Sequence, residues 1–266
     1  MFGWLTERRR AKLLERPFPP AWDAHLDELG LINRLDAEQR QRLRDLVQVF
    51  IAEKHWEGCG GLELTEEMQV TIAAQACFLL LNREHALYAD VDSILVYPSA
   101  MVAPARDRAF FDPGGRVVDE ARPALLGEAH LGGPVILAWD DVLAGARGKG
   151  RRNVVFHELA HKIDMVDGTI DGTPPLEGRG DRRTWAEVCS EVYLELRASV
   201  EAGTSTWLDE YGATNEAEFF AVATEAFFMR PDDLEAHHRE LYAVLADFYK
   251  CEPRQQPVPP DPARSA

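Results

Sequence analysis

The segment NVVFHELAHKID, residues 153–164, places His157 and His161 four positions apart and Glu158 directly after the first histidine. On a helix, residues four apart lie on one face about 5–6 Å from each other, so both imidazoles can reach one metal ion. The opposite face carries an apolar stripe suited to a protein core, formed by Phe156, Leu159, Ala160 and Ile163. The segment therefore predicts a helix that packs against the core on one side and binds a metal on the other.

The residue order of H-E-x-x-H suits hydrolysis with zinc. Glu158 would stand beside a metal-bound water and take its proton, while zinc lowers the pKa of that water to about 7 and polarises a carbonyl group. The alternative is a pair of histidines that are hydrogen-bonded on a solvated helix face. The strand expected just before the segment and the apolar back face of the helix favour the zinc site.

A catalytic zinc needs a third protein ligand and an open fourth position. The metzincin pattern requires Gly three residues and His six residues after His161, where this chain has Asp164 and Asp167, so that class is excluded. The other candidates are acidic, and spacing alone leaves them all open: Asp164, Asp167, Glu187, Glu191, Glu195, Glu218 and Glu225. Glu218 also has a purely structural interpretation, because it lies three residues after Asn215 and could close a capping box.

The chain of 266 residues is strongly acidic, with 45 Asp and Glu against 29 Lys and Arg and a formal net charge of −16. Such a chain repels phosphate backbones and anionic lipids, which argues against nucleic acid or a membrane as a direct partner. Its four cysteines lie far apart without a C-x-x-C pair, which is typical of reduced thiols. Residues 1–20 show no apolar stretch of the secretory type, so we expect a cytoplasmic protein.

The apolar periodicity predicts helices, then short strands, then helices, an order typical of an α+β fold. Besides the metal-binding segment, helices are expected at residues 36–57, 65–82, 182–201, 214–229 and 231–249. Strand-like segments lie at residues 93–98 and 133–139, with a weaker one at 115–121.

We divide the chain into a flexible N-terminal leader (1–20), one domain (21–253) and a disordered Pro-rich tail (254–266). Within the domain, residues up to about 90 form a mostly helical part, and the residues after about 91 carry the sheet and the active site.

Two blocks of the chain, NVVFHELAHKID and YGATNEAEFFAVATEAFF, resemble the Mlc titration factor A family of bacterial zinc peptidases. That family pairs H-E-x-A-H-K-[LI]-D with a later block Y-x-A-T-[DN]-x-A-E-x-F-A-V-x-[ST]-E-x-F-F. The likeness extends to ILVYPSAMV, GPVILAW and LYAVLADFYKCEP, and it covers about residues 22–253. It implies a zincin-like metallopeptidase fold similar to the catalytic domain of anthrax lethal factor.

The resemblance also implies roles for individual residues. His157 and His161 match the zinc-binding histidines of the family, and Glu158 matches the catalytic base. Glu218 matches the third ligand, so the resemblance implies a gluzincin-type metallopeptidase with one Zn²⁺. Tyr211 matches a tyrosine that donates to the oxyanion formed when water attacks a peptide carbonyl. Without the resemblance, Tyr211 would be interpreted as a surface tyrosine at the end of a helix.

Two further carboxylates near the site have less defined roles. Asp164 suits a partner that receives the second N–H of a ligating histidine, or a partner of the helix end. Glu225 lies seven residues after Glu218 and near the same helix face, so either of the two could reach inward.

Two functions are consistent with these residues. The first is a zinc-dependent peptidase that acts on a peptide or protein substrate; the sequence does not distinguish exo- from endopeptidase. The alternative is a regulatory protein that sequesters a transcription repressor of the Mlc type, which controls sugar uptake, with zinc mainly structural. The presence of Glu158 and Tyr211 favours the enzyme, because a binding protein needs neither a base nor an oxyanion donor.

The substrate is expected to lie along residues 132–139. An extended peptide gains affinity by pairing antiparallel with an edge strand, and Pro134 suits such an edge because it cannot donate to a ladder. The alternative is that this segment forms a central, fully paired strand.

Overall fold

The computed structural model describes residues 3–83, 85–100, 133–147 and 150–253. Its helices are α1 (Gly3–Leu14), α2 (Pro20–Asp27), α3 (Ala37–Glu53), α4 (Glu66–Leu79), α5 (Trp139–Ala146), α6 (Val154–Asp164), α7 (Arg179–Glu201), α8 (Glu216–Met229), α9 (Pro231–His237) and α10 (Arg239–Tyr249). Short 3-10 turns are η1 (Ile32–Arg34), η2 (His85–Tyr88), η4 (Met165–Asp167) and η5 (Glu210–Ala213). The strands are β1 (His55–Gly58), β2 (Ser93–Tyr97) and β3 (Val135–Ala138). A mostly helical chain with a small sheet is the α+β architecture predicted from the sequence.

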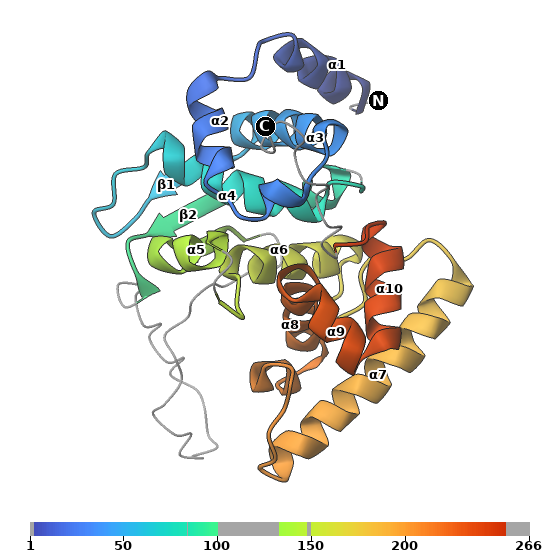
Figure 1. Ribbon diagram of the computed structural model, residues 1–266. Helices are drawn as coiled ribbons and strands as arrows, with labels where there is room; N and C mark the ends of the chain where they lie inside the picture. The colour runs from blue at the N-terminus through green and yellow to red at the C-terminus, as the bar shows by residue number, and fades with distance from the viewer. Residues whose placement is uncertain (1–2, 84, 101–132, 148–149, 254–266) are drawn as a thin grey trace, which may run out of the picture.

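The helices lie in an upper and a lower group, with α5 and α6 between them (Figure 1). The upper group consists of α1 to α4, and the lower group consists of α7 to α10. Within these described ranges, no helix combines the length and the apolar character that a membrane crossing requires.

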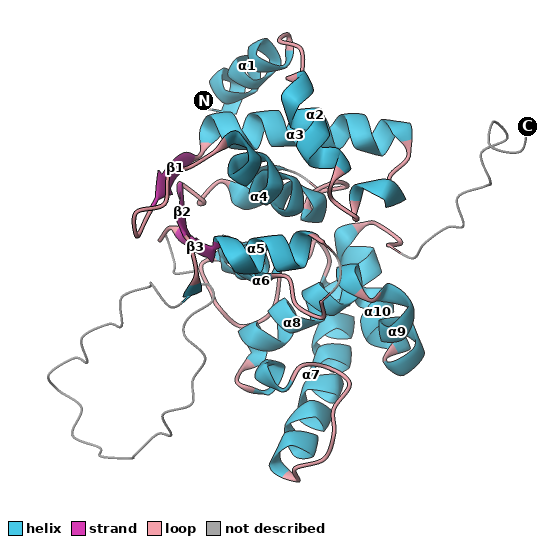
Figure 2. Cartoon of the chain, turned by 60° about the vertical axis from the view of Figure 1, so that its left-hand side comes forward, coloured by secondary structure: helices cyan, strands magenta, loops and turns pink. Residues whose placement is uncertain are grey.

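The sheet lies at one side of the molecule, next to α4 and α5 (Figure 2). Its order is β1-β2-β3 and both pairs are parallel, with Glu57 beside Leu95 and Leu95 beside Ile136. Helix α4 makes the crossover between β1 and β2, since parallel neighbours need a long connection. The strands expected at residues 93–98 and 133–139 are confirmed, whereas 115–121 lies outside the described residues. Among the described strands, β3 forms an edge of the sheet.

The helix expected at residues 36–57 ends earlier than its pattern indicates. Asp36 forms the expected capping box with Gln39, but α3 stops at Glu53 and β1 follows. The backbone N–H of His55 donates to the carbonyl of Asp92, and β1 then pairs with β2. Pairing with a strand almost forty residues away overrides the local helical pattern, so the sheet takes its first strand from the part expected to be mostly helical.

The segment 231–249 forms two helices and not the single one predicted. The backbone leaves helical geometry at His238, with φ −140° and ψ 69°, and the two resulting helices, α9 and α10, contact each other. Helix α5 was not predicted either, because its apolar residues continue those of the preceding strand. Both differences depend on packing between segments and not on local periodicity.

The segment expected to be a flexible leader contains a helix. Residues 3–14 form α1, and Arg10 makes a bidentate ion pair with Glu53 of α3 at 2.7 and 2.8 Å. The side-chain amide of Gln48 donates to the carbonyls of Leu13 and Arg16. These contacts attach α1 to α3 across more than thirty residues of sequence. The division into leader, domain and tail stays a prediction.

The core that supports the site lies between α4, α6 and α8. The ring of Phe156 on α6 lies 5.4 Å from that of Phe228 on α8, and Phe228 lies 5.7 Å from Phe78 on α4. Helix α4 is buried nearly all round, as its composition predicts. The back face of α6 is therefore held by apolar packing, and its polar face is directed toward the first turn of α8.

Candidate metal centre

Helix α6 forms as the sequence predicts and presents both histidines from one face. The side chain of Asn153 caps it by accepting from the backbone N–H of Phe156 at 3.1 Å. The apolar stripe faces the core, and all of its members are fully buried: Phe156, Leu159, Ala160 and Ile163. With this face fixed by packing, His157 and His161 lie one turn apart on the other side.

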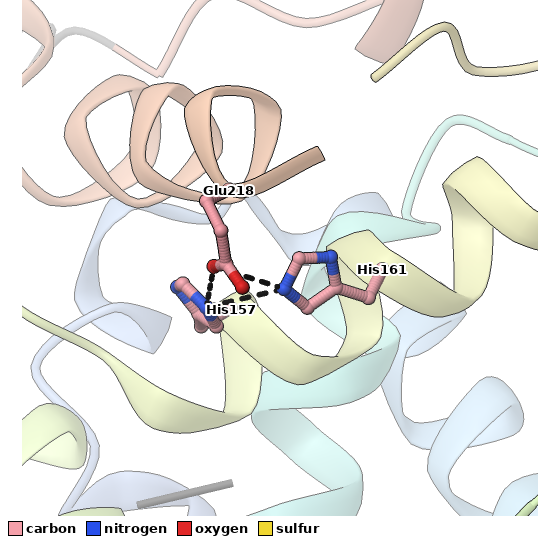
Figure 3. A group of neighbouring side chains, drawn as sticks. All are labelled: His157, His161 and Glu218. Atoms are coloured by element: carbon pink, nitrogen blue, oxygen red, sulfur yellow. Dashed lines mark hydrogen bonds and ion pairs between the residues drawn. The ribbon is translucent and has the colours of Figure 1, made fainter. Parts of the chain in front are cut away.

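Helix α8 brings Glu218 to these histidines. Asn215 caps the helix by accepting from the backbone N–H of Glu218 at 2.9 Å, which is half of a capping box. The carboxylate of Glu218 does not complete the box but points to the imidazoles of His157 and His161 (Figure 3). The structural interpretation of Glu218 as a capping-box residue is therefore only partly correct.

Three donor atoms converge between α6 and α8. The Nε2 atoms of His157 and His161 lie 3.2 Å apart, and Oε2 of Glu218 lies 3.0 Å from the first and 3.3 Å from the second. A tetrahedral ion with bonds of about 2.0–2.1 Å separates its ligand atoms by roughly 3.3 Å. Two imidazole nitrogens and one carboxylate oxygen also form a donor set found at catalytic zinc. The residues present therefore fit such an ion in both chemistry and spacing.

The other carboxylates considered as third ligand lie outside this group. Among the described residues, His157, His161 and Glu218 are the set whose ligand atoms lie within 4.8 Å of one another. It does not include the remaining candidates: Asp164, Asp167, Glu187, Glu191, Glu195 and Glu225. Spacing could not exclude them because the positions of η4, α7 and α8 relative to α6 depend on tertiary packing.

Close contact between carboxylates and imidazoles shifts the pKa values of His157 and Glu218. Burial opposes the charge of His157, but hydrogen bonds to Glu218 and Glu225 prevail and raise its pKa to about 10. Burial also disfavours the ionised form of Glu218, yet the hydrogen bonds from His157 and His161 lower its pKa well below the ordinary value. In the metal-free chain these contacts favour the protonated form of His157 between the two carboxylates.

Glu158 is buried on α6 beside this group. Only 2% of its surface is exposed, and its Oε2 has no hydrogen-bond partner in the described part of the chain. Burial raises the pKa of Glu158 to about 8, and the nearby charge of His157 reduces this effect. A buried, unpaired carboxylate oxygen is costly, so its presence next to a candidate metal site points to a chemical use.

Tyr211 reaches the site from the turn η5. Its hydroxyl donates to Oε1 of Glu218 at 3.3 Å, and its ring lies 5.9 Å from that of His157. The turn is fixed by Asp209, which accepts from the backbone N–H of Tyr211 and makes a bidentate ion pair with Arg152 at 2.7 and 2.9 Å. The tyrosine is nonetheless 47% exposed.

Two carboxylates differ in what they contact. Asp164 is buried and accepts from the backbone N–H of Gly172 at 3.0 Å, so it holds the loop after α6 in the manner of a helix-end partner. Glu225 accepts from Nδ1 of His157 at 2.8 Å, which is the role that the sequence suggested for Asp164. The spacing of seven between Glu218 and Glu225 was the available signal, because two helical turns place both on one face of α8.

The His-His-Glu group of this α+β chain is a donor set typical of metallopeptidases. The chain matches the model of the family described as glucose-regulated metallo-peptidase M90 over residues 4–250, and it belongs to this family. It is 40% identical over 253 residues to uncharacterized protein slr2042 of Synechocystis sp., covering 94% of this chain and 90% of that protein.

Two other relatives carry the name Mlc titration factor A. That of Serratia proteamaculans is 29% identical over 253 residues, which cover 94% of this chain and 92% of the relative. That of Yersinia pestis is 28% identical over 255 residues, which cover 94% and 89%. The resemblance inferred from the two sequence blocks is thus confirmed.

Proposed function

We propose that this chain is a zinc-dependent peptidase that hydrolyses peptide bonds and holds one Zn²⁺ between His157, His161 and Glu218. The observation that carries the proposal is the convergence of these three donor atoms at 3.0–3.3 Å between two packed helices. Membership of a metallo-peptidase family supports it.

Glu158 is the general base of the proposed reaction. When bound, zinc supplies a Lewis acid that lowers the pKa of water and polarises the scissile carbonyl. The Oε2 of Glu158, which has no hydrogen-bond partner among the described residues, accepts the proton of the attacking water, and Glu158 then delivers this proton to the leaving amine. A cation close to this carboxylate favours its ionised form and so counteracts the burial that raises its pKa.

Tyr211 is the proposed oxyanion donor. Its O–H group has a partner on Glu218 at the long end of hydrogen-bond distances, and the side chain is half exposed. A substrate carbonyl beside the ligands could therefore take over this hydrogen bond as negative charge develops on its oxygen.

The ligand set and the base are tested together by metal analysis and a peptidase assay. Wild type should contain about one zinc per chain, and His161→Ala, which removes one of three ligands, should lose most of it. Glu158→Gln should keep zinc and fold but lose nearly all hydrolysis, because an amide cannot accept the proton. Full zinc content in His161→Ala, or full activity in Glu158→Gln, would contradict the respective assignment.

The extended substrate is proposed to pair antiparallel with β3. Support comes from the place of this strand at an edge of the described sheet and from the hydrogen bond of Lys162, on the metal-binding helix, to the carbonyl of Gly133 at 2.7 Å. A structure with a peptide hydroxamate tests the idea. Pairing with β1, the other edge of the described sheet, or with no strand would exclude β3 but leave the zinc chemistry intact.

A second candidate function is suggested by the names of two relatives. Because they are called Mlc titration factor A, this chain could sequester a transcription repressor of the Mlc type, with zinc mainly structural. Wild type and Glu158→Gln would then bind such a repressor equally well, as measured by calorimetry. Absence of binding to the repressor at micromolar concentrations would remove this function and leave the peptidase.

A further inference from the structure

The carboxylate of Glu225 connects the candidate metal centre to the interior of the protein. Its Oε1 accepts from Nδ1 of His157 at 2.8 Å, and its Oε2 accepts from the backbone N–H of Asn153 at 2.5 Å. Glu225 is only 6% exposed. Both oxygens of one buried carboxylate are thus engaged, one by a candidate ligand and the other by the residue that caps the same helix.

The network continues through Asn153 to α4. The side-chain amide of Asn153 donates to Oε1 of Gln75 at 2.8 Å, while its carbonyl oxygen accepts from Phe156 as the helix cap. The amide of Gln75 in turn donates to the carbonyl of Thr71 at 3.1 Å. Asn153 and Gln75 are almost completely buried, so these bonds are shielded from competition with water. A single polar network therefore joins α4, α6 and α8 behind the site.

We propose that Glu225 is a positioning residue that fixes the ring of His157 with Nδ1 protonated and Nε2 directed to the metal. This inference rests on the proposed metal site. The neutral imidazole has one N–H and one lone pair, so a proton held on Nδ1 leaves the lone pair on Nε2. That is the nitrogen that already lies next to His161 and Glu218. Such partners orient ligating histidines and increase their basicity.

A carboxylate at this position cannot be replaced by an amide of the same shape. Glu225 accepts two N–H groups, one from His157 and one from Asn153. In Glu225→Gln only one of the two positions is an acceptor, and the other presents an NH₂ group to a donor. The variant must therefore give up either the hydrogen bond from the backbone N–H of Asn153 or the one from His157, although its volume is unchanged.

The competing explanation is that Glu225 only stabilises the fold by satisfying the backbone N–H of Asn153. Thr224 provides the control for this explanation, because it is fully buried on the same turn of α8. Its hydroxyl shares a hydrogen bond of 2.9 Å with Tyr249, which lies in α10 and not in the metal-binding group. Thr224→Val removes a buried hydrogen bond next to Glu225 but leaves His157 and its partners unchanged.

The experiment compares zinc affinity, by competition with a chelator, in wild type, Glu225→Gln and Thr224→Val. We expect Glu225→Gln to bind zinc about 10–100-fold more weakly, the usual effect of removing such a partner. Thr224→Val should bind within about twofold of wild type even where urea unfolding shows a similar loss of stability. Wild-type affinity in Glu225→Gln, or equal weakening in both variants, would overturn the proposal.

A measurement on wild type covers the case in which Glu225→Gln does not fold. In protein loaded with an NMR-active cadmium isotope, coupling should appear to Nε2 of His157, and Nδ1 should carry a hydrogen-bonded proton. Coupling to Nδ1 would overturn the proposal. Failure of the proposed zinc site would give a different result from failure of the role of Glu225. Wild type would then take up no zinc, or His161→Ala would retain zinc.

Discussion

Gly172 holds the loop after α6 against the helix that carries Glu218. Its backbone N–H donates to Asp164, and its carbonyl accepts from the indole of Trp185 at 3.1 Å. Its φ is +76°, a conformation that L side chains rarely adopt. A Cβ added here would lie 2.7 Å from the carbonyl carbon of Glu216 and closer still to its oxygen. Glu216 is the first residue of α8, two positions before Glu218.

Gly172→Ala should consequently damage both stability and metal binding. The positive φ costs about 1–2 kcal/mol with a side chain present. Carbon atoms in ordinary contact are about 3.5 Å apart, so Glu216 must move by roughly 0.8 Å, and such overpacking adds about 1–3 kcal/mol. Metal sites tolerate deviations of about 0.2 Å in ligand distance. A shift of this size in the turn that carries Glu218 should weaken zinc binding at least about tenfold.

Gly168 offers a matched control in the same loop. Its φ is +90°, but no atom lies within 4 Å of an added Cβ. In Gly168→Ala the free energy of unfolding should therefore fall only by the conformational cost of about 1–2 kcal/mol, and the zinc affinity should stay that of wild type. Urea unfolding of the metal-free proteins and chelator competition measure the two effects. Equal stability and equal zinc affinity in the two variants would show that contact with Glu216 does not position the ligand.

Two further predictions concern catalysis and pH. Tyr211→Phe should keep zinc but lose about 2–4 kcal/mol of transition-state stabilisation, seen mainly in kcat; wild-type rates would make Tyr211 an ordinary surface residue. In the metal-free chain, the pKa of Glu158 is raised from 4.5 to about 8 and that of His157 from 6.5 to about 10, so the folded state binds protons more tightly than the unfolded state. The free energy of unfolding should therefore fall as the pH rises from about 4.5 to about 10, most steeply between about 6.5 and 8, by up to about 1.4 kcal/mol per pH unit for each proton. Zinc should reduce this pH dependence because it displaces the protons. Urea unfolding at about pH 6 and about pH 9, with and without zinc, measures the change in the free energy of unfolding with pH. A pH dependence that is the same with and without zinc would contradict the prediction.

The parts of the site that could be predicted are those fixed by local periodicity. The apolar stripe of α6 and the cap at Asn153 determine which face of the helix is buried. The helical repeat then places His157 and His161 on the opposite face. In the same way, Asn215 and the apolar run after it determine where α8 begins and therefore the first-turn position of Glu218. These features need no knowledge of neighbouring segments.

What could not be predicted depends on contacts between distant segments. The pair of Arg152 and Asp209, which fixes the turn of Tyr211, joins residues 57 positions apart. The bond between Asn153 and Gln75 spans 78 positions, and nothing in the apolar pattern of α4 indicates that this buried glutamine faces α6. That Glu225 and not Asp164 is the partner of His157 has the same origin, since only the packing of α6 against α8 determines which carboxylate meets Nδ1 of this histidine.

The charges of the site explain why a divalent cation suits it. Glu158, Glu218 and Glu225 crowd around His157, and buried carboxylates are unfavourable without compensating positive charge. In the metal-free chain protons supply that charge, because hydrogen bonds to Glu218 and Glu225 raise the pKa of His157 to about 10 and burial raises that of Glu158 to about 8. Asn153 contributes only an N–H group to Glu225 and no charge, so it cannot replace the cation. A divalent ion can displace both protons, and Glu158 would then be the ionised carboxylate whose Oε2 has no partner among the described residues and is free to accept a proton from water.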